Sequence, residues 1–258
     1  MLPREDGSCT ACGQLPKVDR AALGSREDAF PPSAATRAEL DLGLAKEARR
    51  VGLLRWLLLI EVLAGSWLLF REVEQLELIR AFRSGANIGL DRMRESDDGV
   101  SASAGRYFLA YLVSGITWLA WFSRAYANLR LVGSRVTRFT SRWAVAVWFI
   151  PIWFIFRPYQ ISREIWLRSA NKNATRQLGS AHPALLTWWW AAHLLAGFGA
   201  TLEPKLLRGD PSPDQIMLAS VVGTLATLFV VVETILDFKV IARIHDWQQT
   251  FADPTVPA

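Results

Sequence analysis

Apolar residues along the chain gather in four long stretches that polar and charged segments separate. A helix needs roughly 20 mostly apolar residues to cross the hydrocarbon core of a bilayer, because each residue adds about 1.5 Å of length. We interpret each stretch as such a helix. The stretches cover residues 51–70, 107–122, 184–202 and 215–236. The pattern therefore predicts an all-α fold, an integral membrane bundle of four transmembrane helices.

A fifth apolar stretch, residues 143–156, is too short for a comfortable span. As a helix it covers about 21 Å, whereas the hydrocarbon core is about 30 Å thick. Pro151 lacks a backbone donor and clashes with the preceding turn, so we expect a break near Phe149. The segment is therefore predicted to be re-entrant or interfacial, with the four spans covering it. Pro158 is suited to start an interfacial helix over residues 158–170.

Positive residues near the spans favour one topology. Lys46, Arg49 and Arg50 precede the first span and no apolar segment comes before it. We therefore expect an uncleaved signal anchor with a cytoplasmic N-terminus. If residues 143–156 do not cross, most lysines and arginines near the spans lie in the cytoplasm, whereas a fifth span reverses that excess. The prediction is an inner-membrane (cytoplasmic-membrane) protein with four spans and both termini in the cytoplasm.

The chain divides into three parts. They are a flexible cytoplasmic tail over residues 1–36, a helical membrane domain over 37–249 and a short tail over 250–258. Apolar residues recur every third position from Val73 to Phe82, so the first helix should extend past the membrane by about three turns. Several acidic residues and four glycines in residues 84–105 predict an exposed extracytoplasmic loop.

The N-terminal tail carries the only two cysteines of the chain, Cys9 and Cys12, in a Cys-x-x-Cys-Gly motif. Such a motif is half of a zinc ribbon, and a tetrahedral zinc site needs four ligands. The three histidines lie far away, in or beside the spans. We interpret the motif as an unoccupied knuckle and expect no cofactor. A zinc ion shared between two chains and a redox dithiol are the alternatives.

Composition and charge agree with a membrane protein. Hydrophobic residues make up 51% of the 258 residues, and the net charge is +5. In a membrane protein a basic excess is typical of cytoplasmic loops that contact anionic lipid headgroups. Because no aqueous domain interleaves aromatic and basic residues, we expect no nucleic-acid partner. Membrane lipids are the predicted partners, and a membrane protein or a second copy of the chain are further options.

Among the ionisable residues within the predicted spans or at their edges, four are candidate site residues. They are Glu61, His193, Glu233 and Asp237. An ionised side chain costs about 2.5–3.5 kcal/mol near the middle of a transmembrane helix, so each marks a candidate site. In one interpretation they form buried structural pairs of Glu with His or Arg, with Glu233 and Asp237 paired to Arg124 or Arg157. In the other, Glu61 and His193 form a proton or cation path.

A succession of motifs runs from the end of the second span into the interfacial helix. The motifs are Arg-Ala-x-x-Asn at 124–128, Trp-Ala at 143–144, Trp-Phe-x-Pro at 148–151, Pro-Tyr-Gln at 158–160 and Glu-x-Trp at 164–166. Their order resembles the bacterial membrane family called domain of unknown function 4328, most closely over about residues 106–170. The resemblance implies a helical membrane protein and no established activity.

Two departures from the pattern of that family stand beside the match. Ser141-Arg142 precedes Trp143 where a small residue is usual, and Trp153-Phe154 occupies a place where Ala-Asn is common. The second departure removes a polar residue from the break, which weakens the re-entrant interpretation of the segment.

Basic and aromatic residues of the same region predict a groove on the cytoplasmic side that binds an anionic lipid or a small ligand. Its candidate residues are Arg124, Asn128, Trp143, Pro151, Arg157, Tyr159, Gln160, Arg163, Glu164 and Trp166. The alternative is that the positive residues only determine topology.

The sequence carries no nucleophile elbow, no HExxH motif, no Walker loop and no paired catalytic carboxylates, so we expect a non-enzymatic protein. The favoured hypothesis is a multi-pass bacterial inner-membrane protein that binds lipid or a small ligand, or serves as an accessory to a larger complex. The alternative is a small transporter or channel subunit that uses Glu61 and His193.

Overall fold

The computed structural model describes residues 34–129, 137–170 and 183–250. Most of these residues are helical, and no strand is among them. The helices are α2 (Ala34–Arg83), α3 (Leu90–Asn128), α4 (Ser141–Ala146), η1 (Val147–Phe149), η2 (Trp153–Ile155), α5 (Arg157–Ser169), α7 (Ala184–Leu206) and α8 (Pro213–Thr250). The chain divides into two compact units, residues 1–39 and 40–258, and the second holds the bundle. The prediction of an all-α fold is confirmed for the described residues.

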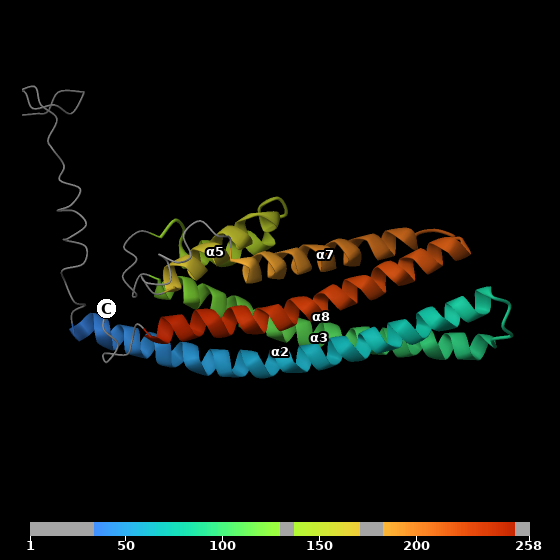
Figure 1. The fold of residues 1–258 in the computed structure, drawn as a ribbon, viewed down its shortest axis with the longest axis horizontal. Helices are drawn as coiled ribbons and strands as arrows, with labels where there is room; N and C mark the ends of the chain where they lie inside the picture. The colour runs from blue at the N-terminus through green and yellow to red at the C-terminus, as the bar shows by residue number, and fades with distance from the viewer. Residues whose placement is uncertain (1–33, 130–136, 171–182, 251–258) are drawn as a thin grey trace, which may run out of the picture. The chain divides into compact units, whose positions relative to one another are not determined.

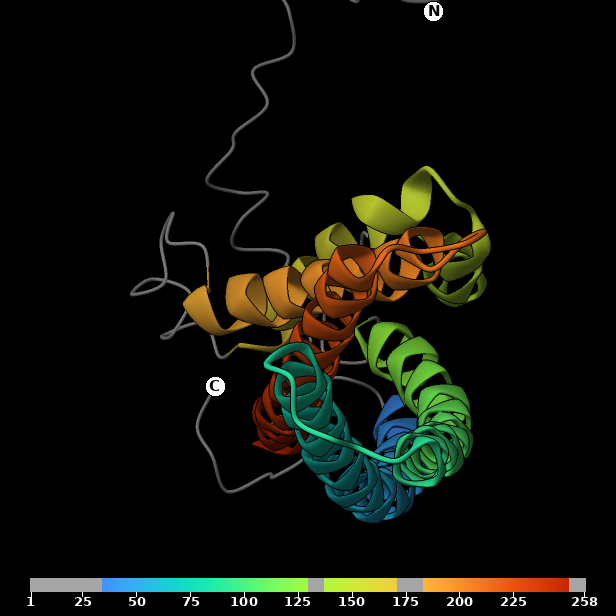
Figure 2. The ribbon, with the colours of Figure 1, turned by 90° about the vertical axis from the view of Figure 1, so that its right-hand side faces the viewer.

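Four long helices, α2, α3, α7 and α8, run alongside one another, and α8 lies between α7 and the α2–α3 pair (Figures 1 and 2). Arg83 at the end of α2 pairs with Asp214 at the start of α8, with 2.6 Å between Nη2 and Oδ1. We call this the turn end, since residues 84–89 and 207–212 connect helices there. At the opposite end Gln248 Nε2 donates to the carbonyl of Ala125 (3.0 Å) and to Ser169 Oγ (2.9 Å). We call this the α5 end.

The segment from α4 to α5 leaves the α5 end and returns to it. Ser123 Oγ on α3 donates to the carbonyl of Ser141 at the start of α4 (3.3 Å), and Ser169 at the end of α5 contacts Gln248. Between these points the chain bends by 111°. Helix η1 ends at Phe149, where the sequence predicts a break, because Pro151 cannot continue the hydrogen-bond ladder.

One predicted loop is wrong. Only residues 84–89 connect α2 to α3, whereas the sequence predicts a loop over residues 84–105. Asp91 lies in the first turn of α3, where a negative charge favours a helix N-terminus. Gln75 Nε2 on α2 donates to Asp97 Oδ1 on α3 at 2.6 Å, which ties the new helix to the extended end of α2. The predicted extension of the first helix beyond its apolar stretch is confirmed, since α2 continues to Arg83.

Two helices of the described part are long and apolar enough to cross a membrane, over Ala48–Arg83 and Pro213–Gln249, or three if the bent pair from α4 to α5 counts as one span. They contain the first and the last of the four predicted spans. Helices α3 and α7 do not meet the same test of length and apolarity. Arg106 and Arg124 bracket the apolar stretch of α3, and α7 contains His193.

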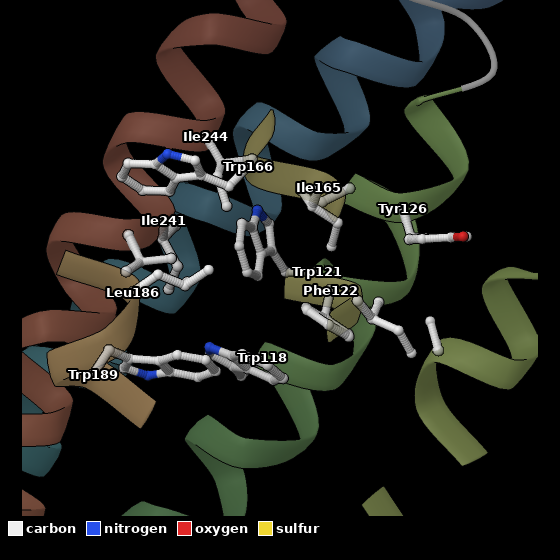
Figure 3. Close-up of a cluster of buried hydrophobic side chains, with 14 of the residues drawn as sticks. Trp118, Trp121, Phe122, Tyr126, Ile165, Trp166, Leu186, Trp189, Ile241 and Ile244 are labelled. Carbon is white, nitrogen blue, oxygen red and sulfur yellow. The ribbon is translucent and has the colours of Figure 1, made fainter. Parts of the chain in front are cut away.

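The densest part of the core lies toward the α5 end and is rich in aromatic rings (Figure 3). Trp118 stacks on Phe122, with ring centroids 4.7 Å apart, and on Trp189 at 6.1 Å. Trp148 of η1 meets Trp118 edge to face at 5.0 Å. Such pairs add about 0.5–1.5 kcal/mol each to the burial of their area, so this cluster fixes α3, α7 and η1 relative to one another.

Candidate functional site

A cavity of about 580 Å³ lies between the four long helices and the broken segment. Trp118 and Trp189 of the aromatic cluster form part of its wall. The remaining aromatic side chains that line it are Tyr107, Phe108, Tyr111, Trp148, Phe149 and Phe154. Its polar side chains are Glu61, Ser114, His193, Glu233, Thr234 and Asp237. All four ionisable residues singled out from the sequence therefore line a single cavity.

Glu61 reaches the cavity from α2 and is buried. Ser114 Oγ on α3 donates a hydrogen bond to Glu61 Oε2, and Thr234 Oγ1 on α8 donates to Oε1 at 3.2 Å. Both donors are neutral hydroxyls. The carboxylate thus joins three helices, and within the described part of the chain its hydrogen bonds come from these two hydroxyls.

His193 and Glu233 form the ion pair or hydrogen-bonded pair of the cavity. The distance between His193 Nδ1 on α7 and Glu233 Oε1 on α8 is 2.6 Å. The His193 ring stacks on Trp190 with centroids 4.9 Å apart, and its Nε2 is buried without a hydrogen-bond partner. The sequence leads us to expect a Glu–His pair, and the structure identifies the acidic partner as Glu233 rather than Glu61.

Asp237 accepts a hydrogen bond from Trp118 Nε1 at 2.9 Å. The predicted pairing of Glu233 and Asp237 with Arg124 or Arg157 is therefore wrong. Arg124 lies six residues beyond Trp118 on α3, about 9 Å further along the helix, which moves it away from the cavity. The Arg157 guanidinium instead donates to Gln160 Oε1 at 3.0 Å, as part of helix α5.

The lining of the cavity contains three carboxyl groups and one imidazole, and no lysine or arginine is among the lining residues that the structure describes. Over the same described ranges, no group of three or more His, Cys, Asp and Glu residues is arranged to hold a metal ion. Cys9 and Cys12 lie outside the described residues. The arrangement can accept hydrogen bonds and positive charge inside an otherwise apolar space.

The cavity opens to the outside of the bundle between α3 and α7. On α3, the lining residues Phe108 and Ile116 are 63% and 62% exposed, and Phe149 of η1 is 72% exposed. Helix α7 meanwhile packs tightly on α8, because Gly199 has no side chain where Ala226 approaches. A Cβ at Gly199 would lie 2.6 Å from Ala226 Cβ. Because one face of α7 packs closely on α8, the face of α7 that does not contact α8 lines the opening.

Several residues of the predicted groove lie in the core at the α5 end. Asn128 is fully buried and its Nδ2 donates to Gln248 Oε1 at 3.4 Å. Glu164 is buried, with 3.0 Å between its Oε1 and Arg168 Nε. Trp166 is buried and its ring meets Trp247 edge to face at 4.8 Å. In this structure the three residues hold α3, α5 and α8 together.

Tyr126 completes the polar network of this end. Its hydroxyl donates to Glu164 Oε2 at 3.1 Å and accepts from the backbone N–H of Phe139 at 2.8 Å. Figure 3 shows the Tyr126 hydroxyl pointing away from the aromatic cluster. Burial raises the pKa of Tyr126 to about 12, so the hydroxyl keeps its proton at neutral pH and remains a donor.

The other predicted groove residues lie on or near the surface. The Arg157 guanidinium lies 5.6 Å from the centroid of the Phe139 ring and 5.9 Å from that of Trp153. Trp143 meets Trp153 edge to face at 5.0 Å. Tyr159 Oη lies 3.2 Å from Thr187 Oγ1. Pro151 and Gln160 are exposed, whereas Arg124 and Arg163 are half-buried. These residues do not line the cavity.

Two neutral polar residues of the cavity, Ser114 and Thr234, are not among the residues singled out from the sequence. Ser114 and Thr234 each lie within an apolar stretch, as Glu61 does, and a search for every polar residue inside a predicted span would have found them. The tyrosine and tryptophan side chains gave no comparable signal, because aromatic residues are frequent throughout these helices.

Comparison with protein families gives one match. The family model described as domain of unknown function (DUF4328) matches residues 84–246. Comparison with curated proteins and with solved structures found no match. The matched region holds α3, α5, α7 and almost all of α8, and hence every lining residue of the cavity except Leu58 and Glu61. The chain belongs to this family, domain of unknown function DUF4328.

Proposed function

We propose that the chain is a non-enzymatic, multi-pass membrane protein that holds a small, mostly apolar ligand in the cavity between α3 and α7. The observation that carries the proposal is the convergence of four ionisable residues from α2, α7 and α8 on one cavity of about 580 Å³. Ligand cavities are typically about 300–1,000 Å³, mainly apolar, with a few convergent polar groups. Ionisable residues within membrane helices are expensive and usually serve a function.

In this proposal all four long helices cross the membrane. Large apolar side chains point outward on α3 and α7 as well as on the two most apolar helices. Trp188 and Phe198 of α7 are 69% and 67% exposed, an arrangement that suits contact with lipid. Tryptophan counts as weakly polar on hydropathy scales, yet it is frequent in membrane helices near the interface.

We place the α5 end in the cytoplasm and the chain in the cytoplasmic membrane. Arginines cluster at that end, and positive residues near the spans favour the cytoplasmic side. Among the described residues they include Arg124, Arg138, Arg142, Arg157, Arg163 and Arg168. Anionic lipid headgroups are the natural counterpart of the exposed members of this group.

The position of the opening supports entry from the lipid. Phe108, Ile116 and Phe149 combine strong exposure with a place in the cavity lining. In a bilayer these side chains would face acyl chains, so a ligand that dissolves in the membrane could reach Glu61 and His193 without crossing water. A lipid or a small amphiphile fits this route better than a strongly hydrated solute.

A variant that fills the cavity tests the proposal. Gly115 lines the cavity and is half-buried, yet a Cβ placed there meets nothing within 4 Å. Gly115→Phe should therefore occupy ligand space without a backbone clash. Gly52 also has nothing within 4 Å and lies outside the cavity, so Gly52→Phe is the matched control.

The measurement is mass spectrometry of small molecules that co-purify in native nanodiscs. We expect the wild type and Gly52→Phe to retain a discrete ligand close to one molecule per chain, and Gly115→Phe to lose most of it. Identical small-molecule profiles for all three proteins would contradict a binding cavity.

A conduit for protons or cations is the second candidate function, and the gathering of Glu61, His193, Glu233 and Asp237 favours it. A conduit requires water at these positions. Cysteine placed at 61 or 193, in a chain whose Cys9 and Cys12 are replaced by serine, should then react with a charged thiol reagent from both sides of the membrane. Unreactive positions would leave the closed binding cavity as the better account.

A further inference from the structure

We propose that the ligand is an amphiphilic organic cation, with an apolar or aromatic body and an ammonium-like or phosphonium-like head. This inference rests on the proposed function of the cavity between α3 and α7 and specifies the chemistry of its occupant.

The carboxyl groups of the cavity outnumber its basic groups. Glu61, Glu233 and Asp237 contribute three carboxyl groups, and among the residues that the structure describes only Glu233 has a basic partner, His193. The hydrogen bonds that Glu61 and Asp237 accept come from Ser114, Thr234 and Trp118, which are neutral donors. A buried negative charge without a positive partner costs several kcal/mol. A cationic ligand would supply the positive charge that the described lining lacks.

The walls of the cavity are apolar and aromatic. Leucine, isoleucine and valine side chains line the cavity together with the rings of Tyr107, Tyr111, Trp118 and Trp148. Aromatic rings attract cations through their π faces, and they also cover apolar groups. An organic cation satisfies both the carboxyl groups and the apolar wall.

The same composition disfavours other ligand classes. An anionic headgroup would meet three carboxyl groups and no lysine or arginine among the described lining residues. A small hard cation needs about six oxygen ligands, whereas the described part of the chain offers no metal-binding group of three acidic, histidine or cysteine residues. A neutral amphiphile is the alternative to a cationic ligand, and the binding experiment distinguishes the two.

Tetraphenylphosphonium and tetraphenylborate provide a matched pair of probes, because they share size and shape and differ in the sign of the charge. Binding of each ion to the purified protein is measured by equilibrium dialysis in nanodiscs of zwitterionic lipid, with empty nanodiscs as the blank. We expect saturable binding of the phosphonium at about one per chain, and borate binding no stronger than in the empty nanodiscs.

Variants assign the selectivity to the carboxyl groups. Glu61→Gln and Asp237→Asn should each weaken phosphonium binding by roughly tenfold or more, since each removes a buried charge that faces the cation. Glu77→Gln removes the same charge from an exposed position of α2 outside the cavity and should bind like the wild type. Thermal unfolding of each variant shows whether it is folded. If a variant does not fold, the comparison of the two ions on the wild-type protein still tests the inference.

Three outcomes would overturn the inference. If folded Glu61→Gln and Asp237→Asn bind the phosphonium as tightly as the wild type, the carboxyl groups do not recognise the cation. Saturable borate binding that Gly115→Phe abolishes would mean that the cavity binds apolar ligands of the wrong charge, which leaves the proposed function intact. If neither ion binds, the inference of a cationic ligand is wrong. The mass spectrometry of co-purified small molecules then tests separately whether the cavity binds a ligand.

Discussion

At the scale of single residues, the buried side chains of Tyr126, Glu164 and Gln248 at the α5 end have specific partners within the protein. Tyr126 connects three elements, because its hydroxyl donates to Glu164 on α5 and accepts from the backbone of Phe139 just before α4. A buried acceptor or donor that loses its partner costs about 1–3 kcal/mol. This network differs from the cavity, where the donors to Glu61 and Asp237 among the described residues are all neutral.

Tyr126→Phe should lower the stability of the protein by about 1–3 kcal/mol, because Glu164 and the Phe139 N–H each lose a partner. Thermal unfolding of the detergent-solubilised protein measures this. Tyr159→Phe is the control, since its hydroxyl contacts Thr187 near the surface and should matter less. Equal shifts in the two variants would contradict a special role for Tyr126.

The pH dependence of that stability follows from the same residue. The pKa of Tyr126 rises from 10.0 to about 12 on folding, so folding favours the protonated hydroxyl. The contribution of the Tyr126 hydroxyl to the free energy of unfolding is complete below pH 10 and is lost as the pH rises toward 12. The difference in melting temperature between wild type and Tyr126→Phe should therefore be constant from about pH 6 to 9. A difference that vanishes in that interval would contradict the assignment.

At the scale of elements, the break at Pro151 shapes one wall of the cavity. Phe149 before it and Phe154 after it both line the cavity, and Trp148 packs on Trp118. The sequence predicts this break well, because proline has a fixed and local effect on a helix. The sequence does not predict the start of α3 at Leu90, because the acidic and glycine-containing residues after it are typical of loops and depend on contacts with α2 for their helical order.

Pro151→Ala should allow the helix to continue through the break, a local gain of about 3 kcal/mol. Continuation would pull Phe149, Phe154 and Trp148 out of place, so we expect normal membrane insertion but a lower melting temperature and loss of the co-purified ligand. Pro204→Ala, inside α7 and away from the break, is the control. A variant as stable as the wild type, with its ligand retained, would mean that the break builds no part of the site.

At the scale of the whole molecule, hydropathy alone recovers part of the architecture. Helices α2 and α8 meet the test of length and apolarity for a span although they carry Glu61, Glu233 and Asp237, whereas α3 and α7 do not meet it. The four ionisable residues could be found from the sequence, but their convergence could not, because it depends on how four helices are rotated about their axes. The partner of His193 illustrates this, since Glu233 rather than Glu61 meets it.

The topology of the bundle gives a prediction at this scale. Reporter fusions truncated after Leu129 and after Ala170 should report the same, cytoplasmic compartment, because the segment between them leaves and returns to the α5 end. A fusion after Leu207, at the turn end, should report the opposite compartment. Opposite compartments for the first two fusions would make the α4–α5 segment a true fifth span.

We infer that the acidic cavity between α3 and α7 lies within the membrane and holds a ligand. An experimental structure of the protein in a lipid nanodisc tests it most directly. We predict that the lipid belt surrounds all four long helices, with ligand density that reaches from the opening at Phe108 and Ile116 to the carboxyl groups of Glu61 and Asp237. Direct packing of α3 on α7 that closes the cavity, or an opening that faces water rather than lipid, would contradict the account.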